Sequence, residues 1–385
     1  MRPSLTSLLT AGACVVLASC TPPTEVDPAT TPTAWEIQPA ANVDAGTSYW
    51  PASQWRTALP SQVGMDSARM ATLSHDVRKR KWPTLRSLLV VHGGYLVFNE
   101  YVAGAHPDSL VKMEDVSKTV TGLLVGVAAR EGKVRLDDAV APYFPEYASL
   151  LSGPPKNALL VDHLLTMRSG ISFQDEPYAG SDLERLDRTT QDWLSLVLSE
   201  SMYDSPGGRW RFNSGGIIAL GGVLRAATGE VADAYASRVL FAPLGITRSA
   251  WVTGQPNGLP QMATGLSMTS ADMLRIGYLL LRNGVWNGTP IVSPEWVASM
   301  RERKSQQLGN WIGYSLDYGR TLWILPALPG SGDTDVLAAS GFGGHWIFIV
   351  PGRDLVVVAT SNASTVATFA QPIQILYDEI VASIH

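Results

Sequence analysis

The two ends of the chain carry short apolar runs that are interrupted by turn-forming residues. Near the start, Ser87 to Val91 and Tyr95 to Tyr101 are separated by His92-Gly93-Gly94, whose glycines supply the positive backbone angles of a tight turn. Near the end, Trp346 to Val350 and Leu355 to Thr360 flank Pro351-Gly352-Arg353-Asp354. Each pair of runs predicts a β-hairpin.

Between these ends, apolar residues recur at helical spacing. Strands at both ends that enclose a mostly helical middle predict the α/β class, with one antiparallel sheet flanked by helices and built from both chain ends. We expect this α/β part at about 53–114 and 310–385, and an inserted, mostly helical subdomain at about 115–309. The predicted helices are Ser67 to Lys79, Val116 to Arg130, Asp162 to Arg168, Gln191 to Ser199, Gly216 to Thr228, Asp233 to Leu240, Ser270 to Asn283 and Val366 to Ile384.

The first fifty residues have the pattern of an export signal and a tether. Arg2 precedes an apolar stretch from Leu5 to Leu17, and Leu17-Ala18-Ser19-Cys20 has the residue order of a bacterial lipoprotein cleavage site. We therefore expect residues 1–20 to be a lipoprotein signal peptide with lipidation at Cys20, and the Pro- and Thr-rich residues 21–52 to be a flexible tether. An ordinary signal peptide with an incidental cysteine is the alternative. The expected location is the bacterial cell envelope, with membrane contact through the lipid anchor only.

Composition excludes several classes of function. The 385 residues are 45% hydrophobic and carry a net charge of -5, with scattered basic residues, so no basic face for nucleic acid is expected. The six histidines lack the paired spacing of metal ligands, and neither a metal nor another cofactor is expected. Of the two cysteines, Cys14 is removed with the signal peptide and Cys20 is the lipidation site, so no disulfide is expected.

Five segments of the chain stand out in order: Lys112 to Ala128, Val161 to Gly170, Pro206 to Gly221, Phe241 to Ile246 and Gly341 to His345. Together they resemble the motifs of the β-lactamase-like serine hydrolases. This family includes class C β-lactamases, D-Ala-D-Ala peptidases, esterases and 6-aminohexanoate-dimer hydrolases, and its first motif is Ser-x-x-Lys at the start of a helix. The glycine-rich last segment is most similar to the 6-aminohexanoate-dimer hydrolase branch.

The resemblance implies acyl-enzyme chemistry on a small amide, ester or peptide. In the family a serine attacks the carbonyl, a lysine or tyrosine takes its proton, and two backbone N–H groups stabilise the oxyanion. Lys118 and Ser214 match two of these positions, and Gly343 and Gly344 are the expected source of one oxyanion N–H. His345 is either a polar group of the site or a satisfied strand residue.

Two of the motif positions depart from the family pattern. Asp115 lies three residues before Lys118, where the resemblance places the serine, and Phe212 takes the place of the tyrosine. Asp115 could cap the helix or pair with Lys118 on one helix face. Ser117 would face away from the site, and Ser109, which begins a literal Ser-x-x-Lys, lies outside the family register.

These departures leave three interpretations open. The first is a pseudoenzyme in which catalysis is impaired and the protein acts as a binding module. The second is an active hydrolase of a small amide, ester or β-lactam, in which Asp115 serves as a base or the nucleophile has moved. The third is an inactivated form of an active enzyme.

Overall fold

The structure is a computed structural model that describes residues 49–51, 54–254, 256–308, 310–311, 314–327 and 335–385. Cys20, the signal peptide and residues 21–48 of the predicted tether lie outside the described residues. The described part belongs to one compact unit, Trp35–His385. None of its helices has the length and apolar character needed to cross a membrane.

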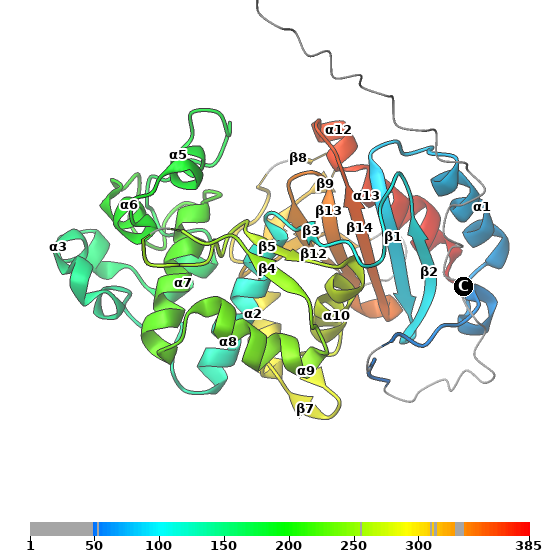
Figure 1. Cartoon of the computed structure of the whole chain (residues 1–385), viewed down its shortest axis with the longest axis horizontal. Coiled ribbons are helices and arrows are strands. Elements are labelled where there is room, and N and C mark those ends of the chain that lie inside the picture. The colour runs from blue at the N-terminus through cyan, green and yellow to red at the C-terminus, as the bar shows by residue number, and fades with distance from the viewer. Residues whose placement is uncertain (1–48, 52–53, 255, 309, 312–313, 328–334) are drawn as a thin grey trace, which may run out of the picture. The chain divides into compact units, whose positions relative to one another are not determined.

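A seven-stranded antiparallel sheet is built from the two ends of the chain, in the order β10-β11-β12-β13-β14-β1-β2 (Figure 1). Both predicted hairpins are confirmed, and Gly93 and Gly94 have the positive φ angles that the first turn requires. The predicted fold class is therefore confirmed. The strands are β1 Leu85–His92, β2 Tyr95–Tyr101, β10 Asp317–Tyr318, β11 Trp323–Leu325, β12 Val336–Gly341, β13 His345–Val350 and β14 Leu355–Ser361.

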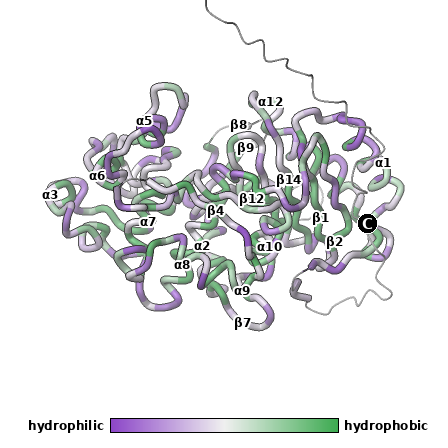
Figure 2. Tube along the Cα trace, in the orientation of Figure 1, coloured by the Kyte–Doolittle hydropathy of each residue, from purple (hydrophilic) through white to green (hydrophobic). Residues whose placement is uncertain are grey.

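Helices cover both faces of this sheet, so that β13 and β14, which are mostly apolar, are buried at every position (Figure 2). The helix α10, Ser270–Leu281, packs so closely on one face that a Cβ at Gly277 would lie 2.7 Å from Ile347 Cγ2. Side chains alternate along a strand, so Trp346 faces the other way, where its Nε1 donates a hydrogen bond to Phe369 O at 3.0 Å. The segment expected to form the helical subdomain thus also supplies one layer of the α/β part.

The helix predicted over Val366 to Ile384 is wrong as a single element. It divides into α12 Val366–Phe369, α13 Gln371–Gln374, a π-helical turn Ile375–Ile380 and a 3-10 turn Val381–Ser383. Pro372 has no backbone N–H and cannot continue the hydrogen-bond ladder of α12. The π-helical turn and the 3-10 turn at the end of the chain lie near α1, Ser67–Arg78.

The helix α2, Val116–Arg130, is buried from Val116 to Ala128 and packs on both β12 and α7, Ser214–Thr228. This arrangement brings the start of α2 to the end of β12. The other helices are α3 Ala148–Leu151, α4 Val161–Leu165, α5 Asp182–Arg188, α6 Trp193–Ser199, α8 Ala232–Ala236, α9 Ala242–Leu244 and α11 Pro294–Met300. The π-helical turn Ser237–Phe241 joins α8 to α9, and short 3-10 turns occur at Pro60–Val63, Ala141–Tyr143, Pro145–Tyr147, Lys156–Ala158 and Pro351–Arg353.

Three smaller sheets were not predicted, because strands of two or three residues carry no measurable periodicity. The first has the order β3-β5-β4, and β3 leads directly into the start of α2. Its strands are β3 Val111–Lys112, β4 Ser249–Trp251 and β5 Leu266–Met268. The other two sheets are hairpins, β6 Val285–Trp286 with β7 Thr289–Pro290 and β8 Asn310–Trp311 with β9 Tyr314–Ser315.

The folded part begins earlier than the predicted boundary at 53. The Trp50 ring lies 5.8 Å from the Tyr278 ring and 5.5 Å from the Trp286 ring. The Tyr278 hydroxyl donates a hydrogen bond to Tyr49 O at 2.9 Å, and Arg275 donates one to Pro51 O at 3.2 Å. Residues 49–51 are therefore packed on the folded body and are not part of a free tether.

Candidate functional site

Asp115 stands at the position that precedes the first turn of α2, and its side chain makes no capping hydrogen bond. Its backbone angles, φ -64° and ψ -12°, are already helical, whereas a capping aspartate normally has an extended backbone. The capping interpretation is therefore wrong. Instead, the Asp115 carboxylate forms an ion pair with the Lys118 ammonium one helical turn away, as the i,i+3 spacing predicts.

The Lys118 ammonium is buried and fully engaged. Its side chain is 3% exposed, and Nζ donates hydrogen bonds to the Asp115 carboxylate, to Ser214 Oγ at 2.9 Å and to Ala263 O at 3.5 Å. An ammonium group has three protons to donate, and three acceptors are present. Lys118 in this arrangement has no lone pair with which to accept a proton.

Asp175 completes the cluster, and no sequence pattern marked it. Its carboxylate accepts hydrogen bonds from the Ser214 N–H at 3.1 and 3.0 Å and from Ser214 Oγ at 2.7 Å, at the first residue of α7. Ser214 therefore links Lys118 to Asp175. Burial raises the pKa of the Asp175 carboxyl to about 6, although Lys118 and the hydrogen bonds from Ser214 oppose this shift.

We expect the raised pKa of Asp175 to leave a measurable pH dependence of stability. The folded state binds this proton more tightly than the unfolded chain, whose carboxyl titrates near 3.8, so the unfolding free energy falls as the pH rises from about 4 to about 6. Asp175→Asn removes this pH-dependent contribution to the unfolding free energy. Urea denaturation across this range should show wild type losing stability relative to the variant, with no further loss above about pH 6.

Asp137→Asn is the matched control, because Asp137 is exposed and its pKa is lowered by a hydrogen bond from Arg135. The stability that Asp137 contributes is lost only below its ordinary pKa, so the difference from wild type should stay nearly constant between pH 4 and 6. If the difference in unfolding free energy between wild type and Asp175→Asn were equally constant over this pH range, it would contradict the raised pKa of Asp175.

Aromatic side chains form one wall of the cluster. The Phe212 ring lies 4.7 Å from Lys118 Nζ and stacks on Trp323 at a centroid distance of 6.2 Å. Phe212 has no hydroxyl, so it offers Lys118 a cation–π contact but no site for a proton. Tyr318 packs edge-on against Trp323 at 4.9 Å, and burial raises its pKa well above the ordinary range. Tyr318 therefore holds its proton and does not replace the missing tyrosine as a base.

The end of β12 places a backbone donor against Asp115. A Cβ at Gly341 would lie 2.2 Å from Met113 O, so only glycine fits where β12 meets the start of α2. The next residue, Phe342, donates its N–H to Asp115 Oδ2 at 3.3 Å.

The N–H that contacts Asp115 lies one residue before Gly343 and Gly344, the pair predicted to supply an oxyanion donor. Both glycines have positive φ in the turn between β12 and β13, and the Gly344 N–H is used by Gly341 O at 3.2 Å. The tight turn directs the N–H of Phe342, not that of Gly344, to the site.

His345 is the first residue of β13 and pairs with Gly341 across the sheet. It is 9% exposed, and its Nδ1 has no hydrogen-bond partner among the described residues. This excludes the alternative in which His345 is a strand residue whose polar atoms all have hydrogen-bond partners. Burial lowers the pKa of His345 to about 4, against the attraction of the Asp115 carboxylate, so the imidazole is neutral at pH 7.

The other serines near the motif do not provide a substitute nucleophile at Lys118. Ser117 is buried and its Oγ accepts a hydrogen bond from the Leu266 N–H at 3.2 Å. Ser109 lies in the segment between β2 and β3, and Lys112 pairs with Glu114 at 3.0 Å. In the part of the chain that the structure describes, no group of three or more His, Cys, Asp or Glu side chains is placed to hold a metal ion.

Comparisons with known proteins agree with this fold and motif order. The Beta-lactamase family model matches residues 74–381. The 6-aminohexanoate-dimer hydrolase of Paenarthrobacter ureafaciens is 26% identical over 326 residues, which cover 79% of this chain and 80% of that protein.

Solved structures also share the fold. EstCE1, a hydrolase with promiscuous acyltransferase activity, aligns with a TM-score of 0.68 and 18% identity, covering 80% of this chain and 97% of that one. The penicillin-binding protein from Bacillus halodurans aligns with a TM-score of 0.62 and 18% identity, covering 80% and 100%. The match of the family model over most of the chain, together with this fold, shows that the chain belongs to the beta-lactamase family of serine hydrolases.

Proposed function

We propose that this protein binds a small amide, ester or peptide ligand at the Asp115 site and that its acyl-enzyme chemistry is impaired. The observation that carries the proposal is the position of the Asp115 carboxylate, which is paired with Lys118 and accepts the Phe342 N–H. The ligand class rests on the similarity to a 6-aminohexanoate-dimer hydrolase and to EstCE1.

Each group that acyl transfer needs is either replaced or engaged. A carboxylate is a poor nucleophile towards an amide, and the Lys118 ammonium has no lone pair to take a proton. The Phe342 N–H already donates to Asp115 Oδ2, so a substrate carbonyl would have to displace a charged acceptor from it. The loss of chemistry is therefore expected from the two contacts of the Asp115 carboxylate, with Lys118 and with the Phe342 N–H.

An active hydrolase with Asp115 as a general base on water is the second candidate. It is favoured by exposure, since the Asp115 side chain is 20% exposed and the Lys118 side chain only 3%. A nucleophile that has moved to Ser214 is disfavoured, because Ser214 is completely buried and its hydroxyl donates to Asp175. A general base leaves no covalent intermediate, so labelling and turnover have to be measured together.

Covalent probes test the proposal directly. Wild type incubated with a fluorophosphonate probe or a fluorescent penicillin should show no labelled band, and it should not hydrolyse p-nitrophenyl butyrate above the Asp115→Ala background. Asp115→Ser is the matched control, because labelling of this variant shows that the probe reaches the site. Labelling of wild type would overturn the proposal, and turnover without labelling would establish the general-base candidate.

We further propose that the protein is a lipoprotein of the bacterial cell envelope, on the sequence Leu17-Ala18-Ser19-Cys20 and the Pro- and Thr-rich segment after it. Cys20→Ala should abolish lipidation and release the protein from membrane fractions. Cys14→Ala should leave membrane association unchanged, because Cys14 lies inside the segment that is removed. Persistence of Cys20→Ala in the membrane, together with a wild type that carries no lipid by mass spectrometry, would reject the assignment.

A further inference from the structure

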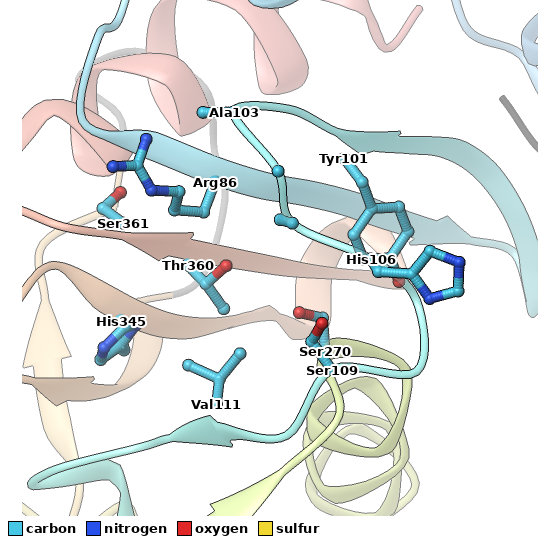
Figure 3. Close-up of a pocket in the computed structure, with 12 residues that line it drawn as sticks. Arg86, Tyr101, Ala103, His106, Ser109, Val111, Ser270, His345, Thr360 and Ser361 are labelled. Atoms are coloured by element: carbon cyan, nitrogen blue, oxygen red, sulfur yellow. The ribbon is translucent and has the colours of Figure 1, made fainter. Parts of the chain in front are cut away.

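A separate pocket of about 270 Å³ lies beside the Asp115 site, where β1, β13 and β14 end (Figure 3). The segment between β2 and β3 closes it, and His345 forms part of its wall. Nothing in the acyl-transfer scheme uses this pocket. Its contents can therefore be inferred independently of whether Asp115 supports catalysis.

The pocket lining combines the positive charge of Arg86 with neutral hydrogen-bonding groups and contains no carboxylate. Arg86, His106 and His345 line it together with five hydroxyl side chains, and none of its twelve lining residues is Asp or Glu. The nearest acid in sequence, Asp108, is 3.6 Å from His106 and 3.9 Å from Arg248. A cavity with this lining favours an anion over a neutral or cationic ligand.

The two groups best suited to hold an anion have no partners in the described part of the chain. Arg86 has no side-chain hydrogen bond or ion pair there, and His345 Nδ1 is buried without an acceptor or donor. A buried nitrogen without a partner is costly in a low-dielectric interior. That cost falls on His345 Nδ1, because Arg86 is only half-buried. An anion that enters the pocket would give the Arg86 guanidinium a charged partner and would lie beside the His345 ring.

Strand order places Arg86 and His345 on β1 and β13, on either side of β14. Ser87, the neighbour of Arg86, pairs with Thr360 on β14, and the pairing of Trp346 with Ala359 sets His345 level with Thr360 on the other side. Adjacent strands are about 4.8 Å apart, so Arg86 and His345 start from backbones roughly 10 Å apart. A carboxylate between two side chains of this length is within reach of both, while Tyr101 and Val111 offer apolar surface to its carbon chain.

We propose that this pocket binds a small organic anion, whose carboxylate is held by the Arg86 guanidinium and the His345 imidazole. The site is distinct from the Asp115 cluster and goes beyond the proposed function, since it requires neither Asp115 nor Lys118. The small volume restricts the ligand to a short-chain carboxylate. A guanidinium can donate two hydrogen bonds to one carboxylate, which favours carboxylate over chloride.

Sodium propionate is a suitable probe, and propionamide is its neutral control of the same shape. Calorimetry on the full chain should give propionate a Kd on the order of 1 mM and should detect no binding of propionamide. NMR of the histidine ring protons should show that propionate raises the pKa of His345, because a nearby anion favours the charged imidazole.

Arg86→Gln should weaken propionate binding at least tenfold, because it removes the charge and the paired donors. Arg188→Gln is the matched control, since Arg188 lies on α5 and does not line the pocket. His345→Gln should also weaken binding, and the His345 titration in wild type tests the site without any variant. Equal binding of propionate and propionamide, full affinity in Arg86→Gln, or an unchanged His345 titration would overturn the proposal.

Discussion

Replacing Asp115 with serine should restore hydrolysis of an activated ester. The change removes the carboxylate from Lys118 and places a hydroxyl one helical turn from the amine. It also releases the Phe342 N–H, which can then donate to the oxyanion of the substrate. A single oxyanion donor is typically worth about 10²–10³ in rate, so p-nitrophenyl butyrate hydrolysis should rise at least about a hundredfold over wild type.

Adding Phe212→Tyr to Asp115→Ser should increase the rate further. The Phe212 ring is fixed by stacking on Trp323 and lies against Lys118, so a tyrosine can keep the ring position and add a hydroxyl. A positioned acid–base group contributes roughly a hundredfold or more. The increase should appear mainly in kcat, because the new hydroxyl acts on proton transfer.

Asp115→Ala and the single Phe212→Tyr variant are the controls for this series. Both lack the serine and should remain inactive. If wild type hydrolyses the ester and Asp115→Ala abolishes the activity, Asp115 is itself a catalytic group. In that case the impaired-catalysis proposal is wrong and the general-base alternative holds.

The parts of the fold that could be predicted are those with long local patterns. The hairpins β1–β2 and β13–β14 and the helix α2 each contain apolar stretches bounded by recognisable turns or ends. The sheet β3-β5-β4 has only two or three residues per strand and depends on contacts between distant segments. The packing of α10 on the large sheet was equally inaccessible, because periodicity identifies a helix but not the surface that it covers.

The candidate site likewise has one part that local spacing predicts and another that only the tertiary structure brings together. The Asp115–Lys118 pair follows from i,i+3 spacing, which is a local property of the helix. Asp175 lies 39 residues from Ser214 in a segment without periodicity, so only the tertiary structure brings the two together. The contact of the Phe342 N–H with Asp115 was not predicted, since the direction of a backbone N–H depends on the backbone angles of the turn and not on residue type.

The largest loss of stability is expected from Lys118→Met. This substitution keeps most of the side-chain volume and leaves the Asp115 and Asp175 carboxylates without the cation that lies between them. Removing one partner of a buried ion pair costs about 3–5 kcal/mol, which urea denaturation at pH 7 measures directly. Lys133→Met is the matched control just beyond the other end of α2, where Lys133 pairs with Glu131 at the surface, and it should cost about 0–1 kcal/mol.

The Lys118→Met loss should shrink towards pH 5, because Asp175 then takes up a proton and one of the two uncompensated charges disappears. Equal losses for the two lysine variants at pH 7 would show that solvent, and not Lys118, neutralises the carboxylates of this site.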